Sequence, residues 1–316
     1  MAKKFAPVIV LAGGLSHERE VSQRSGRRVA EALRRRGHQV TETDVGPDLV
    51  AELTAQPQAV VVPMLHGGVG EDGALREVLE LLDIAYVGCS GAACRTTFDK
   101  SIAGLLVARR GGRVPAQVAL PHEIFRELGA ARLVEALGER MSFPLIVKPS
   151  RSGSALGTTK VNSADELRPA MVAAYAYGDV AIVEEYVAGT ELAVTVIVKG
   201  DQVRVLPAVE IRPSQGIYDY AARYTSGATR FIVPADVDDR AEQSAVDLAR
   251  LVVDALDLDG LVRVDMIVDD EGRAWFLEGN VAPGMTETSL APLALEAAGL
   301  SLGEVFGGLV DEAERA

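Results

Sequence analysis

The chain has 316 residues, of which 48% are hydrophobic and 24% charged, and its formal net charge is -13. Because that length exceeds one ordinary domain, we expect two or three lobes with cores of their own, and the composition is typical of a folded chain. The negative charge disfavours nucleic acid and anionic membrane surfaces as partners, since the average field would repel both.

The N-terminal sequence MAKKFAPVIVLAGG places two lysines before a short apolar run. That run is too short to span a membrane and carries no signal-peptide cleavage pattern, so we expect a cytoplasmic protein. Cys89 and Cys94 lie in an apolar stretch at a spacing that fits neither a disulfide framework nor a zinc site. We therefore expect both thiols to be reduced and buried.

The first 99 residues are predicted to form an α/β lobe with a parallel sheet. Apolar runs and amphipathic periodicity predict strands at 8–11, 38–43 and 59–64, and helices at 21–35 and 74–82. The arginine runs at 27–28 and 34–36 fall in the first helix, where we expect a solvated face. Gly13 and Gly14 follow the first strand, but the G-x-G-x-x-G pattern of a dinucleotide site is absent, so we reject that interpretation.

Two further lobes are predicted, at 100–183 and 184–316. The central lobe should contain a helix, strands at 145–148, 158–161 and 180–183, and a second helix before the last strand. The C-terminal lobe should contain strands at 192–198 and 203–207, an irregular stretch at 216–228, a helix at 240–256 and a hairpin at 261–277. The expected fold class is therefore α/β with α+β lobes.

The hairpin RVDMIVDDEGRAWFLEGN, residues 263–280, carries the most specific pattern. Its turn at 269–272 lies between two alternating strands. Arg263 and Asp265 therefore lie on one face of the first strand, and Glu278 and Asn280 lie on one face of the second. If these faces coincide, two carboxylates and an amide lie close together, a set of oxygen ligands that suits Mg²⁺. A polar outer face on an edge hairpin would produce the same pattern.

Two other segments have the composition of a nucleotide site. The loop KPSRSGSALG at 148–157 leaves a strand through small residues whose backbone N–H groups can approach phosphate, and Lys148 adds charge. The stretch IVEEYVAGTE at 182–191 ends a strand and offers a backbone edge to an adenine, with Glu191 placed to accept from ribose hydroxyls. A flexible hairpin loop and solvated acids are the alternatives when each segment is considered alone.

Together with Lys100, these segments resemble the ATP-grasp fold. The motifs AGGLSHEREVS (12–22), LHGGVGEDG (65–73), YDYAARY (218–224) and NVAPGMTETSL (280–290) narrow the resemblance to the D-alanine:D-alanine ligase family, from residue 8 to about 310. The resemblance implies an N-terminal parallel-sheet α/β lobe and two lobes enclosing ATP. It also implies a homodimer that activates D-alanine as an acyl phosphate and joins it to a second D-alanine for peptidoglycan synthesis.

The resemblance implies roles for individual residues. The ammonium of the first substrate is assigned to Glu18, assisted by Ser154 and Tyr224, in a pocket lined by His66 and Glu71. The reacting carboxyl is assigned to Arg263 and the backbone of Gly284, and the second amino acid to Ser289 and Leu290. ATP phosphates are assigned to Lys100 and Lys148, and the nucleoside to Glu184, Glu185, Val187 and Glu191. Two Mg²⁺ ions, with Mn²⁺ as an alternative, are assigned to Asp265, Glu278 and Asn280.

Some of these residues also have structural interpretations. Glu18 fits an acid favoured by the dipole at a helix start, and His66 fits a buried, hydrogen-bonded histidine. Tyr224 favours an amine over a hydroxy acid as the second substrate, because ligases of the family that make D-alanyl-D-lactate typically lack it.

The chain departs from the family pattern at three positions. Ala221 and Arg223 stand where the family usually has an acid and a lysine, and Arg95 stands where a small or apolar residue is usual. Because a planar guanidinium is not equivalent to a point charge, the identity of the second substrate stays open, with Arg223 expected near its carboxylate. The alternatives are a specialised ligase that couples a different amino acid and a non-catalytic ATP-binding module.

Overall fold

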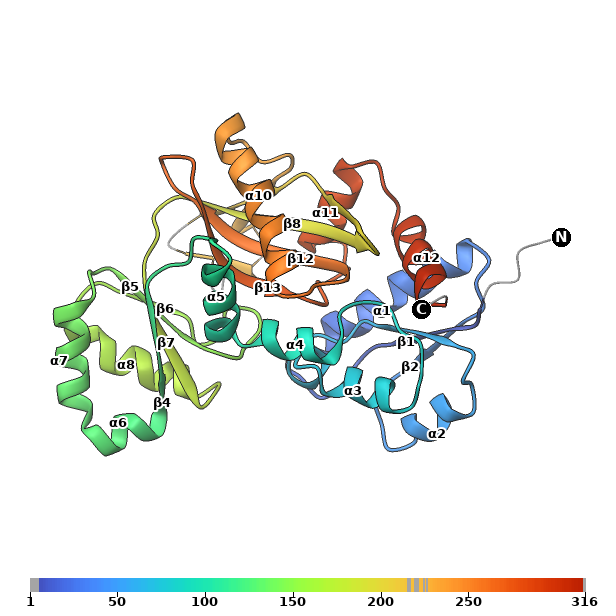
Figure 1. Ribbon diagram of the computed structural model, residues 1–316, viewed down its shortest axis with the longest axis horizontal. Helices are drawn as coiled ribbons and strands as arrows, with labels where there is room; N and C mark the ends of the chain where they lie inside the picture. The colour runs from blue at the N-terminus through green and yellow to red at the C-terminus, as the bar shows by residue number, and fades with distance from the viewer. Residues whose placement is uncertain (1–5, 215–216, 219–221, 224, 226, 315–316) are drawn as a thin grey trace.

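The computed structural model describes residues 6–214, 217–218, 222–223, 225 and 227–314. Three β-sheets organise this part of the chain: one parallel sheet of three strands and two antiparallel sheets of four and six strands (Figure 1). The expected fold class, an N-terminal parallel-sheet lobe followed by two mixed lobes, is confirmed by this arrangement.

The N-terminal lobe is a parallel sheet with strand order β2-β1-β3. Its strands are β1 (Val8–Leu11), β2 (Val40–Thr43) and β3 (Val60–Pro63). Its helical segments are α1 (Arg19–Arg35), α2 (Leu49–Thr54), the 3₁₀ turn η1 (Gly68–Gly70) and α3 (Ala74–Leu81). The central and flanking strands β1 and β3 are fully buried, as their unbroken apolar runs predict, and the arginine runs of α1 are mainly exposed.

The helices α4 (Gly91–Phe98) and α5 (Lys100–Arg109) connect this lobe to the rest of the chain. Asp99 caps α5 by accepting from the backbone N–H groups of Ser101 and Ile102. Cys89 and Cys94 are buried free thiols, as expected, and they pack in one core with Ala103 of α5. Helix α5 contacts the last strand of the six-stranded sheet, so the start of the predicted central lobe packs against the C-terminal one.

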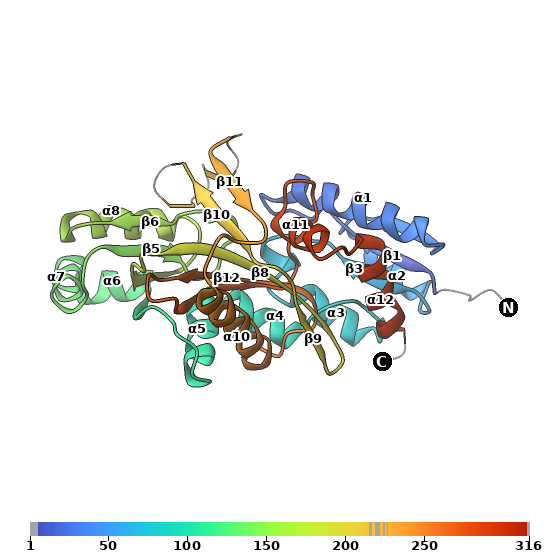
Figure 2. The same ribbon diagram turned by 90° about the horizontal axis from the view of Figure 1, so that it is seen from above.

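The central sheet is antiparallel with strand order β4-β7-β5-β6. Its strands are β4 (Gln117–Pro121), β5 (Leu145–Pro149), β6 (Thr159–Val161) and β7 (Val180–Glu185). The accompanying helices are α6 (His122–Leu128), α7 (Ala130–Arg140) and α8 (Ala164–Tyr175). Helix α8 buries Leu167 and Met171 against the sheet, while the loop at 150–158 leaves β5 toward the other lobes (Figure 2).

The C-terminal sheet is antiparallel, in the order β11-β10-β8-β12-β13, with β9 added to β8. Its strands are β8 (Thr190–Lys199), β9 (Gln202–Val205), β10 (Val209–Pro213), β11 (Thr229–Ile232), β12 (Gly260–Val268) and β13 (Ala274–Asn280). Helix α10 (Asp239–Ala255) covers one face and shares a core with β8 and β12.

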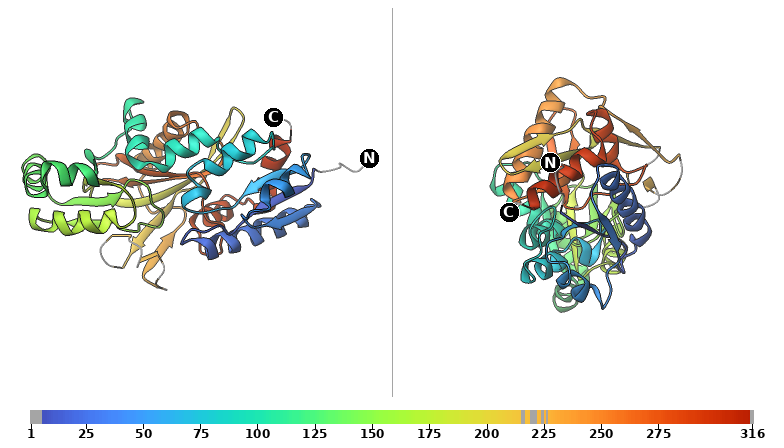
Figure 3. Two further views of the ribbon diagram at one scale, coloured as in Figure 1. Left: turned by 90° about the horizontal axis from the view of Figure 1, so that it is seen from below. Right: turned by 90° about the vertical axis from the view of Figure 1, so that its right-hand side faces the viewer.

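The last two helices, α11 (Leu290–Ala297) and α12 (Leu302–Ala313), return to the N-terminal lobe. They lie between α1 and the six-stranded sheet (Figure 3), and a single core joins Val8 of β1, Leu33 of α1 and Phe306 of α12. Among the described residues no single helix is long and apolar enough to span a membrane; only α11 and α12 taken together, across a bend of 99°, have the length and composition.

Candidate active site

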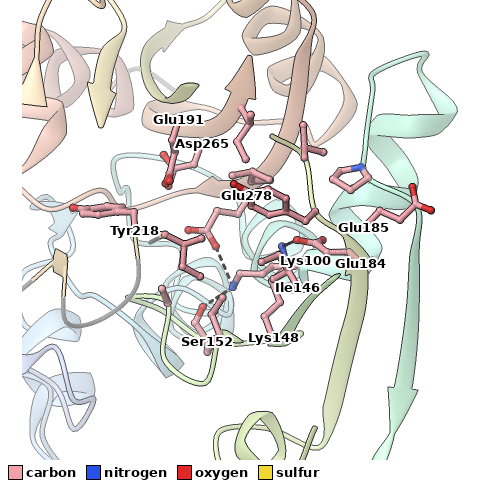
Figure 4. Close-up of a pocket in the computed structure, with 18 of the residues that line it drawn as sticks. Lys100, Ile146, Lys148, Ser152, Glu184, Glu185, Glu191, Tyr218, Asp265 and Glu278 are labelled. Atoms are coloured by element: carbon pink, nitrogen blue, oxygen red, sulfur yellow. Dashed lines mark hydrogen bonds and ion pairs between the residues drawn. The ribbon is translucent and has the colours of Figure 1, made fainter. Parts of the chain in front are cut away.

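Two neighbouring cavities lie where the three sheets meet. The first, between the two antiparallel sheets (Figure 4), is lined by nine of the residues expected to act, namely Lys100, Lys148, Glu184, Glu185, Val187, Glu191, Arg223, Asp265 and Glu278. The second is lined by the other predicted residues, Glu18, His66, Glu71, Ser154, Arg263, Asn280, Gly284, Ser289 and Leu290. Arg223 and Tyr218 line both cavities. Tyr224 and Ala221 lie outside the described residues.

The first cavity places two lysines against buried carboxylates. Lys148 on β5 and Glu184 on β7 come from paired strands, and Lys148 Nζ donates to Glu184 Oε1 at 2.6 Å. Lys100 Nζ lies 3.2 Å from Glu278 Oε2 and donates to the Ser152 carbonyl oxygen at 2.5 Å (Figure 4). Both ammonium groups are nearly enclosed by protein, so their field on an anionic ligand is screened little by solvent.

The wall beside the lysines combines apolar side chains with the backbone of the 182–191 segment. Apolar side chains suited to a flat ring come from Ile146, Ile267 and Leu277. The backbone N–H groups of Glu185 and Tyr186 are already bonded to the carbonyl oxygens of Ala116 and Pro144. Other backbone groups of the 182–191 segment are therefore left to form hydrogen bonds with a base. Val187 belongs to this segment and lines the cavity.

The hairpin of β12 and β13 brings its polar side chains together on one face. Asp265 pairs directly with Glu278 and Arg263 with Asn280, and a β-bulge follows Asp265. Arg263 donates from Nε and Nη2 to the two carboxylate oxygens of Asp265, at 2.7 and 2.8 Å, and Asn280 Nδ2 lies 3.2 Å from Asp265 Oδ2. The two strand faces, whose coincidence the sequence left open, therefore coincide in the structure.

The donor set of this hairpin fits a divalent cation that takes oxygen ligands. Burial alone would raise the pKa of Glu278, but the charges of Lys100, Arg223, Lys148 and Arg263 lower it to about 2, so this carboxylate is ionised at neutral pH. The described residues contain no cluster of three His, Cys, Asp or Glu side chains suited to a metal. An ion here would thus rely on two carboxylates, the amide of Asn280 and the oxygens of its substrate.

Glu18 places a partly buried carboxylate in the second cavity. Glu18, at the start of α1, accepts a hydrogen bond from Ser154 Oγ of the 150–158 loop. A Cβ atom at Gly67 or Gly153 would lie 2.6 Å from Glu18 Oε2, so both loops approach the carboxylate closely, and Gly67 also has a φ of 68° that favours glycine. Ser154 itself has a φ of 54°, in the left-handed region. Three separate segments thus converge on Glu18, which fits a site for a small cation.

Two titratable groups beside Glu18 are shifted toward their neutral forms. Burial raises the pKa of Glu71 to about 8, and the carboxylate of Glu18 adds to that shift, although Gly67 and Lys100 oppose it. Burial lowers the pKa of His66 to about 4, even though the carbonyl of Ala282 favours the charged form. At neutral pH the pocket therefore presents a neutral imidazole at His66 and a protonated carboxyl at Glu71.

His66 connects the N-terminal lobe to the loop after β13. Its Nδ1 lies 2.9 Å from Ala282 O and its Nε2 lies 3.0 Å from Ser25 Oγ, which also accepts from Met285 N at 2.9 Å. This contact set agrees with the structural interpretation of a buried, hydrogen-bonded histidine. His66 still lines the cavity, so it shapes the pocket through the 282–285 loop.

The loop at 281–289 forms the floor of the second cavity. A Cβ atom at Gly284 would lie 2.8 Å from Ser289 Oγ, so the backbone of Gly284 approaches closely. Ser289 Oγ accepts from Thr286 N at 3.1 Å and precedes α11, whose first residue is the buried Leu290. The N-terminus of α11 faces the cavity, and its dipole favours an anionic group there.

Two residues of the site carry no role in the sequence-based assignment. Tyr218, inside the YDYAARY motif, lies under the Arg223 guanidinium at 4.4 Å from ring centroid to Cζ, and its other side meets Phe231 at 6.2 Å. Asp99 accepts from Ser150 Oγ at 2.6 Å and from Arg151 Nε at 3.0 Å, which ties the loop after β5 to the helix that begins with Lys100. The sequence signal that could have identified Tyr218 is an aromatic residue close to a basic one in the same motif. No local sequence signal indicates a role for Asp99.

Known proteins are similar to this chain over almost its whole length. Residues 46–89 and 114–311 match the family models described as D-ala D-ala ligase N-terminus and C-terminus. A D-alanine–D-alanine ligase of Pseudomonas putida (strain GB-1) is 37% identical over 310 residues, which are 98% of this chain and 94% of the relative.

Solved structures have the same fold. The VanG D-Ala:D-Ser ligase of Enterococcus faecalis superposes with a TM-score of 0.84 at 29% identity, over 98% of this chain and 100% of that one. The D-alanine–D-alanine ligase of Bacillus anthracis complexed with ATP has a TM-score of 0.81 at 24% identity, over 98% of each chain, a likeness that shows the fold alone. From its matched segments and its full-length relatives, this chain belongs to the D-alanine–D-alanine ligase family.

Proposed function

We propose that this protein is an ATP-dependent ligase that activates D-alanine as an acyl phosphate and joins it to a second D-alanine. The observation that carries the proposal is the junction of the two cavities. A lysine-lined cavity that contains the polar face of the β12–β13 hairpin lies beside a second cavity that offers Glu18 to an ammonium and Arg263 to a carboxylate. That pair selects an α-amino acid as the first substrate.

The first step forms the acyl phosphate. A carboxylate resists attack by an amine because it is anionic and has no leaving group. A carboxylate oxygen of the first D-alanine therefore attacks the γ-phosphorus of ATP, the bond to the β,γ-bridging oxygen breaks, and ADP leaves. Lys100 and Lys148 stabilise the charge on the phosphates, and Arg263 orients the carboxylate. Bound Mg²⁺, held by Asp265, Glu278 and Asn280, would neutralise phosphate charge.

The second step forms the peptide bond. The deprotonated amine of the second D-alanine attacks the acyl carbon, and the tetrahedral intermediate places its oxyanion toward Arg263 and the Gly284 N–H. Collapse of the intermediate breaks the bond to the phosphate oxygen and releases inorganic phosphate. Ser289 and the N-terminus of α11 bind the second carboxylate, and Arg223, which lines both cavities, is placed to contact it or the phosphate.

The nucleoside of ATP is proposed to bind at the acidic end of the lysine-lined cavity. Glu184, Glu185, Val187 and Glu191 contact the nucleoside. Burial raises the pKa of Glu191 to about 8, so at neutral pH it can donate as well as accept toward a ribose hydroxyl. The protein acts as a cytoplasmic homodimer in peptidoglycan synthesis; its molecular mass in solution tests the dimer.

A specialised ligase is the second candidate, because Arg223 alters the charge geometry at the second substrate and VanG, at 29% identity, is a D-Ala:D-Ser ligase. The test is ADP release with D-alanine alone, then with D-alanine paired with D-serine, D-lactate or L-amino acids, with mass spectrometry of the products. We expect D-alanyl-D-alanine from D-alanine alone and little product from D-lactate. Dipeptide from another pair only would favour the specialised ligase, and nucleotide binding without turnover would favour a non-catalytic module.

A further inference from the structure

Arg76 on α3 is the largest fully buried side chain of the described residues, at 1% exposure. Its Nη1 donates to the carbonyl oxygen of Gly70 at 2.7 Å, but its Nε has no hydrogen-bond partner. No carboxylate in the described part of the chain forms an ion pair with it. Because a guanidinium remains protonated even when buried, the structure encloses a positive charge that one neutral carbonyl only partly compensates.

A small cavity lies against this side chain. Its volume is about 20 Å³, which is room for one water-sized species. Apart from Arg76 the wall is apolar, with side chains from Val62, Met64, Val87, Leu261, Val281, Ala282, Pro283, Met285 and Phe306. The cavity is distinct from both cavities of the active site, although it shares Ala282 and Pro283 of the 281–285 loop with the second one.

The charge of Arg76 decides which species fits the cavity. A water molecule would accept the Nε–H bond but would leave the net charge uncompensated, and apolar walls offer few further partners to it. We propose that this cavity binds one small monovalent anion, a halide, against the Nε–H of Arg76.

Bromide identifies such a site directly, because its anomalous scattering distinguishes it from water. Crystals of the full-length protein equilibrated with sodium bromide should show an anomalous peak within hydrogen-bonding distance of Arg76 Nε. A cavity that is empty or holds a non-scattering water under these conditions overturns the proposal. Exposed bromide peaks elsewhere would be adventitious ions only and do not enter the test.

Thermal unfolding tests the same site in solution. Replacing potassium gluconate with potassium bromide at constant ionic strength should raise Tm by about 2 °C or more, because a ligand that binds only the folded state stabilises it. Arg76→Gln should lose this rise, while Arg110→Gln, which removes an exposed arginine paired with Asp254, should keep it. Val87→Ile retains Arg76 but reduces the cavity, so it should weaken the rise even if Arg76→Gln fails to fold. An equal rise in wild type and Arg76→Gln contradicts the proposal.

Discussion

Glu18 and Glu71 line the same cavity, and the raised pKa of Glu71 makes the stability of the protein depend on pH. The pKa of Glu71 is raised from its ordinary value of 4.5 to about 8, mainly by burial and then by Glu18. The folded protein thus retains a proton that the unfolded chain has lost. Stability from Glu71 is fully present below about pH 4.5 and is lost as the pH rises through 8.

Glu71→Gln should remove this pH dependence. Between pH 5 and pH 8, the free energy of unfolding of the ligand-free wild type should fall relative to the variant by at least about 1 kcal/mol. Denaturant titration at the two pH values measures it, with Glu123→Gln, an exposed carboxyl, as the control. Parallel pH profiles for wild type and Glu71→Gln would show that Glu71 is ionised in the folded protein.

Arg263→Ala should lower kcat by about 100-fold or more, the usual scale for removing one preorganised donor at a developing charge. The same change leaves Asp265 without its bidentate partner, so the variant must first be shown to be folded by its unfolding transition. If kcat and kcat/KM both fall by less than about fivefold, Arg263 does not face the reacting carboxyl.

Tyr218 is expected to hold Arg223 in position. The guanidinium lies over the ring, and Arg223 lines both cavities. Tyr218→Leu should lower kcat/KM by about 3-fold to 5-fold, since an exposed cation–π contact contributes about 0.5–1 kcal/mol. Tyr218→Phe keeps the ring and should retain wild-type kcat/KM. Equal losses in both variants would assign the effect to the hydroxyl instead.

At the scale of the elements, the β12–β13 hairpin holds the proposed metal ligands through strand register. Asp265→Asn and Glu278→Gln should each abolish turnover. Because Asp265→Asn weakens the buried bidentate contact with Arg263, the unfolding transition of each variant must first show that it is folded. In calorimetry, Mg²⁺ should no longer strengthen nucleotide binding to either variant, while wild type should bind ATP more tightly with Mg²⁺ than with EDTA. Asp270→Asn, in the turn of the same hairpin, is the matched control. Unchanged Mg²⁺ dependence in the ligand variants would remove the metal assignment.

The sequence predicts some elements well and others poorly, for physical reasons. Strict alternation put Arg263 and Asp265 on one face of their strand and Glu278 and Asn280 on one face of theirs. Glu278 lies opposite Asp265 only because the bulge after Asp265 shifts the register by one residue, and that bulge has no local signal in the sequence. The strands β10 and β11 were not predicted, because segments of five and four residues are too short for periodicity to identify them. Helices α11 and α12 were not predicted. Both are apolar on several sides, which are buried between two lobes, so they lack the amphipathic pattern of a surface helix.

At the scale of the whole molecule, the active site is assembled from segments distant in the sequence. Glu18 meets Ser154 from the central lobe, and Lys100 meets Glu278 from the last sheet. Periodicity gives neither contact, because both depend on how the lobes pack; only the resemblance to the family grouped these residues beforehand. The lobe boundaries at 99 and 183 stay a prediction, and the packing of α5 on β13 shows how closely the parts are joined.

The central claim is that a carboxylate of D-alanine attacks ATP and forms an acyl phosphate that a second D-alanine consumes. Mass spectrometry of the products made from ATP and D-alanine labelled with ¹⁸O in both carboxylate oxygens tests it most directly. Because the oxygen that attacks phosphorus departs with the phosphate, we predict D-alanyl-D-alanine together with inorganic phosphate that carries one ¹⁸O atom per dipeptide. Unlabelled phosphate, or ADP without any dipeptide, would contradict the claim.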